Sequence, residues 1–404
     1  HWLEDYTDIP YPFAKYSFII LPGFQYGGME HTGATLYNDT RMFLSEHPTL
    51  DEELARAKLI AHETAHMWFG DYVTMDWFND VWTKEVFANY FAACITEPLF
   101  PSVNHSLNWI KTYTAASLAE DRTSGSNSIR QPLDNLRNAG LIYGNIIYNK
   151  APVMMQKLVE IMGEKAYQEG IQEYLKTYAY SNATWDDLIT ILDAKTEEDL
   201  ASFSDVWVNQ KGMPHISFTN RCGQLEIRQR DPLNRGLIWP QRFQITFIGD
   251  ESTTVEVDLS QETYALTVPL DTKAILPNTD ERGYGLFIPD EQSRAWLLAH
   301  WQEITDDTAR QSLLMLLYEN YQHRIITDKE WMNALLNGLK TEKNALIAST
   351  LCSYLGGPMR KLKDEKQEET IWGWTEKHPI ASCRLQLMRS LISNASAPLS
   401  IEKL

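Results

Sequence analysis

The sequence has 404 residues, of which 44% are hydrophobic and 22% charged, and its formal net charge is −18. Such a length suffices for two or three domains, and the composition is that of a globular protein rather than of a disordered, collagen-like or coiled-coil chain. The acidic excess argues against nucleic acid or an anionic membrane surface as a partner, and no apolar run approaches the roughly 18 residues that a membrane span needs.

The chain begins with HWLE, without an initiator Met, a basic n-region or an apolar h-region. We therefore expect it to start inside a longer protein, so that any targeting signal lies outside the sequence. The four cysteines are widely spaced and include no Cys-x-x-Cys pair: Cys94, Cys222, Cys352 and Cys383. This spacing favours buried apolar residues or free thiols over a disulfide framework or a sulfur-ligated zinc site. The sequence leaves the compartment and the oligomeric state open.

Residues 1–213 mix short extended stretches with long helical ones. Residues 16–21 and 33–37 are predicted strands. Thr49 and Glu52 have the spacing of a capping box, which predicts a helix that runs to Phe69 and ends at Gly70. A second helix is expected from Asn79 or Asp80 to the residue before Pro98. Further helical patterns cover residues 152–162, 164–178 and 184–192.

The pattern of apolar and polar residues changes after residue 213. Residues 225–227, 243–247 and 255–259 alternate apolar and polar side chains and are separated by turn formers, which predicts a small β-sandwich over residues 214–289. From residue 290 to the end the pattern is helical again, without strands and without a clean repeat period. This favours a C-terminal α-helical, solenoid-like segment over residues 290–404.

The stretch HETAHMWFGD carries the strongest chemical signal. His62 and His66 are four residues apart, so on a helix both imidazoles project from one face and can share a metal ion. Glu63 lies near that face without being a ligand. Eighteen residues separate His66 from Glu85, a carboxylate on the second predicted helix. A catalytic zinc site needs three protein ligands and one open position, and this set supplies them.

The chemistry follows from charge. Zinc lowers the pKa of a bound water to about 7, so that hydroxide is available at neutral pH. Glu63 is placed to take the proton of this water and to pass it to a leaving amine. Glu85 contributes one negative charge against the two positive charges of the ion, which leaves the site net positive and Lewis-acidic.

His-Glu-x-x-His, eighteen residues and then Glu is the gluzincin signature, and WFGDYVTMDWFNDVWTKEVFANYF resembles the aminopeptidase N-like zinc peptidases. YPFAKYSFIILPGFQYGGMEHTGATLYND resembles that family's strand and exopeptidase loop, and IIYNKAPVMMQKL resembles its Tyr-x-Lys-Gly-Ala segment. WVNQKGMPHISF and NTDERGYGLF resemble the junctions on either side of its β-sandwich domain. The resemblance covers about residues 10–290.

The resemblance implies a fold and a set of roles. Residues 1–213 would form a thermolysin-like α+β catalytic domain, in a chain that lacks the family's N-terminal domain. One Zn²⁺ per chain would be held by His62, His66 and Glu85, with Glu63 as general base and Tyr148 as hydrogen-bond donor to the oxyanion. The substrate-binding residues would be Gly27, Gly28, Met29 and Glu30, with Glu30 binding the α-ammonium group of a peptide that has a free N-terminus.

The sequence also departs from the family pattern. His31 stands where the exopeptidase loop usually has Asn, Val86 follows Glu85 where Gly is usual, and Ala92 replaces a common Glu. Asp71 stands where Asn or Asp occurs and is either a second-shell partner of a ligand histidine or a solvated aspartate. None of these positions is a metal ligand, so we expect an altered rate or specificity rather than an inactive site.

The sequence favours a zinc aminopeptidase that hydrolyses the N-terminal bond of peptides. Three alternatives remain open at this point: an epoxide-hydrolysing relative of the leukotriene hydrolases, a catalytically impaired peptide-binding relative, and an endopeptidase. The intact residues His62, Glu63, His66, Glu85 and Tyr148 argue against a non-catalytic protein, and the Glu30 loop argues against an endopeptidase. The preferred N-terminal residue of the substrate cannot be read from the sequence.

Overall fold

The protein is described by a computed structural model that covers residues 1–403. The chain forms two compact units. The first comprises His1–His105 and Thr112–Gly212, and the second comprises Ser106–Lys111 and Met213–Leu404. The division of the second unit into a sandwich domain and a helical domain stays a prediction.

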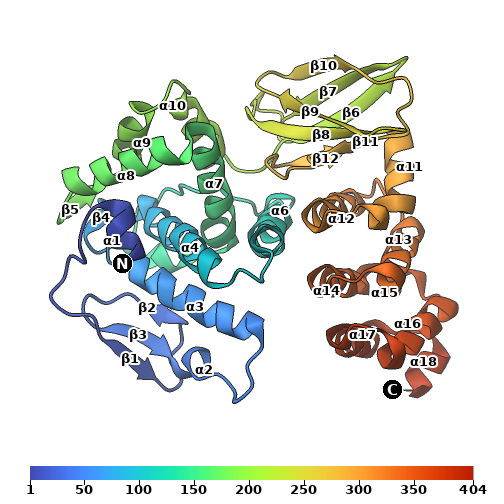
Figure 1. The fold of residues 1–404 in the computed structure, drawn as a ribbon, viewed down its shortest axis with the longest axis horizontal. Helices are drawn as coiled ribbons and strands as arrows, with labels where there is room; N and C mark the ends of the chain where they lie inside the picture. The colour runs from blue at the N-terminus through green and yellow to red at the C-terminus, as the bar shows by residue number, and fades with distance from the viewer. Residues whose placement is uncertain (404) are drawn as a thin grey trace. The chain divides into compact units, whose positions relative to one another are not determined.

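The first unit combines small sheets with a set of helices (Figure 1). One sheet has the order β1-β3-β2, in which β1 and β3 are parallel and β2 and β3 antiparallel. A second pairs β4 with β5 in parallel. The strands are β1 (Phe18–Leu21), β2 (Gly28–Met29), β3 (Thr35–Asn38), β4 (Val73–Met75) and β5 (Ser181–Ala183). Both predicted strands of this region are present, and the pair Gly28–Met29 forms one that was not predicted.

The helix that carries the HETAH stretch is α3 (Leu50–Ala65). The predicted capping box is present: Thr49 accepts a hydrogen bond from the Glu52 main chain, and the Glu52 carboxylate accepts one from that of Thr49. The prediction that this helix runs to Phe69 is wrong, because it ends at Ala65 with His66 as its C-cap. The main-chain carbonyls of residues 66–68 accept hydrogen bonds from the N–H groups five residues later in the chain, instead of four as in an α-helix. Gly70 follows with a φ of +131°, which a residue with a side chain rarely adopts, and the chain then enters β4.

The second predicted helix is α4 (Trp82–Thr96), preceded by a 3₁₀ turn at Phe78–Asp80, so it begins two residues later than expected. Its buried face is rich in aromatic side chains, and Phe69 stacks on Phe87 and Phe91 at centroid distances of 4.6 and 4.8 Å. Because α3 and α4 pack directly against each other, residues on their facing sides meet. The remaining helices of the first unit are α1 (Trp2–Thr7), α2 (Asp39–Met42), α6 (Ala115–Asp121), α7 (Ala151–Met162), α8 (Glu164–Thr177), α9 (Trp185–Asp193) and α10 (Leu200–Phe203). Helix α5 (His105–Trp109) belongs to the second unit except for its first residue.

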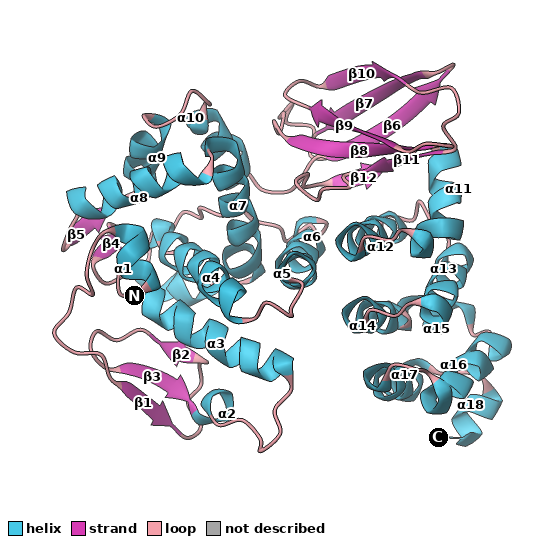
Figure 2. Ribbon diagram, in the orientation of Figure 1, coloured by secondary structure: helices cyan, strands magenta, loops and turns pink. Residues whose placement is uncertain are grey.

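The second unit contains two sheets, of order β10-β7-β6-β12 and β11-β8-β9, as Figure 2 shows in magenta. Their strands are β6 (His215–Arg221), β7 (Gln224–Arg230), β8 (Arg242–Ile248), β9 (Thr253–Asp258), β10 (Thr263–Thr267), β11 (Ala274–Pro277) and β12 (Leu286–Ile288). The alternation of β7 is strict, with Leu225, Ile227 and Gln229 buried. Inward residues of both sheets share one apolar core, which includes Phe218, Phe243 and Ile245.

Helices fill the rest of the second unit and stack in two columns in Figure 1, with α12, α14 and α17 in one and α13, α15 and α16 in the other. They are α11 (Glu291–His300), α12 (Asp307–Gln322), α13 (Asp328–Thr341), α14 (Ala345–Tyr354), α15 (Gly356–Leu362), α16 (Glu365–Lys377), α17 (Ala381–Asn394) and α18 (Pro398–Lys403). Strand β11 is buried on both faces, because Ala274 and Leu276 join the helical core while Ile275 joins the sandwich core. Within residues 1–403, no helix has the length and apolar character needed to cross a membrane.

Candidate metal centre

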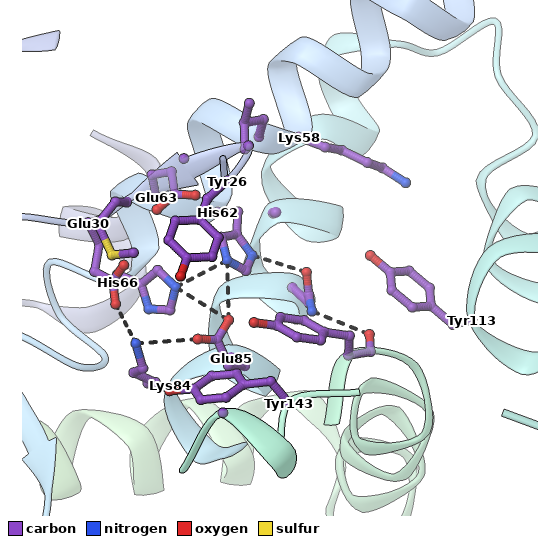
Figure 3. Close-up of a pocket in the computed structure, with 18 residues that line it drawn as sticks. Tyr26, Glu30, Lys58, His62, Glu63, His66, Lys84, Glu85, Tyr113 and Tyr143 are labelled. Carbon is purple, nitrogen blue, oxygen red and sulfur yellow. Dashed lines mark hydrogen bonds and ion pairs between the residues drawn. The ribbon is translucent and has the colours of Figure 1, made fainter. Parts of the chain in front are cut away.

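Three donor atoms from α3 and α4 converge on one point (Figure 3). Nε2 of His62 lies 3.1 Å from Nε2 of His66. Oε2 of Glu85 lies 3.5 Å from the first nitrogen and 3.8 Å from the second. His66 and Glu85 are buried, and His62 is only partly exposed. The packing of α3 on α4 thus brings together the three side chains that the sequence singled out as ligands.

The outer nitrogens of both imidazoles are fixed by carbonyl oxygens. Nδ1 of His62 lies 3.0 Å from Oδ1 of Asn89, and Nδ1 of His66 lies 3.1 Å from the main-chain oxygen of Phe69. The orientation of the Asn89 amide is itself set, because its Nδ2 donates to the main-chain oxygen of Tyr148. Each Nδ1 must therefore carry the proton, which leaves the lone pair of each Nε2 directed at the shared point.

The donor set fits zinc in chemistry and spacing. Two neutral imidazoles and one carboxylate are ligands that Zn²⁺ accepts in catalytic sites. Tetrahedral coordination with bonds of about 2.0–2.1 Å implies donor atoms about 3.3 Å apart, and the three separations of 3.1, 3.5 and 3.8 Å bracket this value. Burial alone would raise the pKa of Glu85, but the hydrogen bond to His62 and the positive charge of Lys84 hold it well below its usual range. The carboxylate is thus kept in the form that binds a cation.

Glu63 lies beside this point without belonging to the ligand triad. Its side chain is 4% exposed, and burial raises its pKa to about 7, with His62 opposing the rise and the charges of Glu30 and Glu85 adding to it. Its position depends on a glycine in β2, since a Cβ at Gly28 would stand 2.2 Å from Oε1 of Glu63. A buried carboxylate with this pKa exchanges protons readily at neutral pH.

The Glu30 carboxylate lies near the same point, so that one donor atom each from Glu30, Glu63 and His66 fall within 4.8 Å of one another. Glu30 is not unpaired. Its Oε1 forms an ion pair with Nζ of Lys84, the residue that precedes Glu85 on α4. The Nζ atom also lies 3.3 Å from Oε1 of Glu85. Figure 3 shows the two contacts as a chain that runs from Glu30 through Lys84 to Glu85.

Tyr148 lies on a π-helical turn, Ile146–Lys150, that leads directly into α7. This turn is anchored by Lys150, whose buried ammonium pairs with Asp121 at 2.8 Å and donates to the Gly212 carbonyl at 2.9 Å. Tyr148 itself is 37% exposed, and partial burial raises the pKa of its hydroxyl above the ordinary value, so it is a proton donor at neutral pH. Such turns often occur at functional sites.

The three candidate ligands, Glu63 and Lys84 line one cavity of about 790 Å³. The cavity contains the predicted substrate-binding residues Gly27, Gly28, Met29 and Glu30 together with Tyr148. Its remaining lining residues include Tyr26, Lys58, Leu59, Ala92, Tyr113, Gly140 and Tyr143. His31 is exposed and is not among the lining residues, whereas Ala92 is. The replacement of the family's usual Glu by Ala92 therefore changes the cavity wall, whereas the replacement of Asn by His31 does not.

Asp71 does not have the role that was considered for it. The Nδ1 atoms of the two histidines are bonded to Asn89 and to the Phe69 carbonyl, so Asp71 is not their partner. It is not a fully solvated aspartate either, since its Oδ2 is buried without a hydrogen bond from the described residues. Burial raises its pKa to about 7, and the charge of Glu30 adds to this.

Sequence reasoning missed Asn89, Lys84 and Lys58. Asn89 follows Glu85 by four residues on α4 and Lys58 precedes His62 by four on α3, so helical spacing places each on the face of a ligand. The four-residue spacing could therefore have predicted both positions from the sequence. No sequence pattern could have predicted the contact of Lys84, because its partner Glu30 lies 54 residues earlier in the chain.

Comparison with known proteins agrees with this site. The model of the peptidase family M1 domain matches residues 1–207. Among the curated relatives, aminopeptidase N of Streptomyces lividans is 28% identical over 378 residues, which cover 87% of this chain and 44% of that protein. Probable aminopeptidase 2 of Sulfurisphaera tokodaii is 26% identical over 295 residues, which cover 70% and 36% of the two chains. Aminopeptidase M1 of Arabidopsis thaliana is 31% identical over 234 residues, which cover 58% and 26%.

The chain spans less than half the length of these relatives. The family match nevertheless covers the segment that holds every donor atom of the centre, from the Glu30 loop through α3 and α4 to the turn of Tyr148. The chain therefore belongs to peptidase family M1, as an aminopeptidase N-like gluzincin.

Proposed function

We propose that the protein is a zinc-dependent aminopeptidase that hydrolyses the N-terminal peptide bond of peptides with a free N-terminus. The observation that supports this most directly is the arrangement of two carboxylates around one donor triad. Glu63 lies beside His62, His66 and Glu85, while Glu30 faces the same point from β2 and its loop. The first carboxylate suits proton transfer, and the second suits recognition of an ammonium group.

One Zn²⁺ held by His62, His66 and Glu85 would supply a Lewis acid that polarises the scissile carbonyl and lowers the pKa of water. Glu63 takes the proton from the attacking water and delivers it to the nitrogen of the departing peptide. The position of its buried carboxylate beside the donor triad suits both steps, because a general base must lie within reach of the proton that it accepts. The hydroxyl group of Tyr148 donates a hydrogen bond to the oxygen of the tetrahedral intermediate.

Glu30 fixes which bond is cut. A buried carboxylate that accepts the α-ammonium group holds the first residue of the peptide at a set distance from the scissile bond, so cleavage removes one residue at a time. A substrate whose amine is blocked cannot make this charge-assisted contact, so it lacks the interaction that would position its first residue. Gly27 and Gly28 let the extended chain of the substrate approach β2 closely.

We further propose that residues 1–213 form a thermolysin-like catalytic domain, followed by a β-sandwich domain over residues 214–289 and a helical domain over residues 290–404. The competing activities have less support. The Glu30 carboxylate counts against an endopeptidase, and the complete set of donors with Glu63 and Tyr148 counts against a binding protein without activity. The aminopeptidase names of the relatives do not favour an epoxide hydrolase.

The test is a matched pair of substrates. The zinc-loaded full chain is given leucine p-nitroanilide and its N-acetyl form, and release of p-nitroaniline is followed. We expect the free amine to be cleaved and the acetylated form to be resistant. Equal cleavage of both would indicate an endopeptidase, and cleavage of neither by protein that contains stoichiometric zinc would count against the peptidase assignment.

A further inference from the structure

The carboxylate that would receive the substrate amine already has a cationic partner from the protein itself. Nζ of Lys84 is ion-paired with Oε1 of Glu30 and lies 3.3 Å from Oε1 of Glu85. The three side chains are 16%, 15% and 6% exposed, so the contact lies largely out of water. Buried charges placed together in this way are held much more firmly than an exposed pair.

The geometry leaves the metal ligand free for its role. Glu85 faces the two imidazoles through Oε2 and faces Lys84 through its other oxygen, Oε1. The stem of Lys84 packs by Gly70, where an added Cβ would stand 3.4 Å from the Lys84 Cβ. An ion pair between Lys84 and Glu30 is thus compatible with an occupied metal centre.

A lysine side chain ends in the same primary ammonium group that a peptide presents at its N-terminus. We propose that Lys84 is a specificity-determining residue that occupies Glu30 in the free protein and competes with the substrate amine for it. This rests on the proposed function, in which Glu30 receives that amine. The incoming group must take over Oε1 of Glu30 from Lys84, which keeps Oε1 of Glu85 as its second partner. Affinity for a free N-terminus is accordingly lower than an unpaired Glu30 would give.

The chain offers a matched control. Lys58 lines the same cavity from α3, and Figure 3 shows that its side chain extends away from Glu30. Replacing Lys58 with Met removes one positive charge from the cavity without touching the Glu30 contact. Replacing Lys84 with Arg keeps a cation at the tested position, whereas Lys84→Met removes it and preserves most of the side-chain volume.

The experiment measures equilibrium binding rather than turnover. The full chain is used without added zinc, so that the probe is not hydrolysed; it is labelled with ¹³C at the methionine methyl groups, and the signal of Met29 in the cavity wall reports binding. Leucinamide is the probe, and 4-methylpentanamide, which lacks the amine, is its neutral counterpart. Titrations at pH 7 keep the probe largely in its ammonium form, since α-amino groups titrate at about 7.7–8.0.

We expect leucinamide to bind Lys84→Met at least about tenfold more tightly than the original chain, because a charge-assisted hydrogen bond no longer has to be exchanged. Affinity for 4-methylpentanamide should stay within about twofold, and Lys84→Arg and Lys58→Met should behave like the original chain. Unchanged or weaker leucinamide binding by Lys84→Met would overturn the inference.

Glu30→Gln separates this inference from the proposed function. If leucinamide binds Glu30→Gln as well as it binds the original chain, Glu30 is not the amine acceptor, and both the competition and that part of the proposed function fail. If Glu30→Gln loses the binding but Lys84→Met does not gain any, only the competition by Lys84 is wrong.

Discussion

The amide of Asn89 connects His62 to the turn that carries Tyr148. Its Oδ1 lies 3.0 Å from Nδ1 of His62, and its Nδ2 donates to the main-chain oxygen of Tyr148 at 3.4 Å. One side chain on α4 thus fixes the tautomer of a proposed ligand on α3 and the position of the π-helical turn. Such a link couples the metal centre to the proposed oxyanion donor.

Asn89→Ala is therefore expected to weaken zinc binding by about 10- to 100-fold, because His62 loses the acceptor that orients its ring. The affinity is measured by competition with a chromogenic chelator. The exposed strand residue Asn220 provides a control, since Asn220→Ala removes the same amide far along the sequence from the ligands. An unchanged zinc affinity in Asn89→Ala would show that the ring is held without it.

Gly28 gives a second prediction. A Cβ there would meet Oε1, Cδ and Cγ of Glu63 at 2.2–2.6 Å, so Gly28→Ala must displace the Glu63 carboxylate. We expect a loss of kcat/KM of about 100-fold or more with zinc content retained, since a general base is sensitive to small displacements. Gly140→Ala is the matched variant, because Gly140 lines the same cavity and its added Cβ would meet no atom within 4 Å. Similar activity in the two variants would contradict the prediction.

Glu63→Gln tests the general base directly. The change removes proton transfer but keeps the shape of the side chain, so we expect one zinc per chain by elemental analysis and a fall in kcat of about 100- to 10,000-fold. Loss of the metal together with the activity would place Glu63 among the ligands instead. Turnover at the original rate in a metal-loaded variant would refute the assignment.

The sequence alone predicted the parts of the site that depend on local spacing. His62 and His66 share a face because they are one turn apart, and the capping box of Thr49 and Glu52 indicated where that helix begins. The second helix then brought Glu85 to the same point. Strands of the second unit were likewise visible in their two-residue alternation, as in β7.

The remaining features depend on contacts between distant segments. The pair of Glu30 and Lys84 joins residues 54 positions apart, and no local pattern indicates it. The early end of α3 arises because the carbonyls after His66 bond to groups that lead into β4, whereas the apolar run MWF suggested a longer helix. The sequence left open whether Asp71 contacts a ligand histidine or is solvated, and the partners of the two Nδ1 atoms, Asn89 and the Phe69 carbonyl, come from other positions.

Outside the metal centre, the environment of Glu281 disfavours the ionised form of its carboxyl group. It lies in a loop between β11 and β12 with a φ of 62°, and Asn278 ties this loop by hydrogen bonds with the main chain of Gly283 at 2.7 and 3.0 Å. Its Oε1 is buried and has no hydrogen-bond partner among residues 1–403. Burial raises the pKa of Glu281 to about 9, and the charges of Asp306 and Asp280 add to this.

Because that pKa exceeds the ordinary value of 4.5, the folded chain retains a proton that the unfolded chain releases between these two pH values. The contribution of Glu281 to stability therefore falls as the pH rises from 4.5 towards 9. Glu281→Gln mimics the protonated form at every pH. We expect this variant to be more stable than the original chain by about 1–2 kcal/mol at pH 8 and by much less at pH 5. Urea unfolding at the two pH values measures the difference in the free energy of unfolding between the variant and the original chain. Glu251 is exposed, so Glu251→Gln is the control. A gain in stability that is the same at both pH values would mean that Glu281 is already ionised in the folded protein.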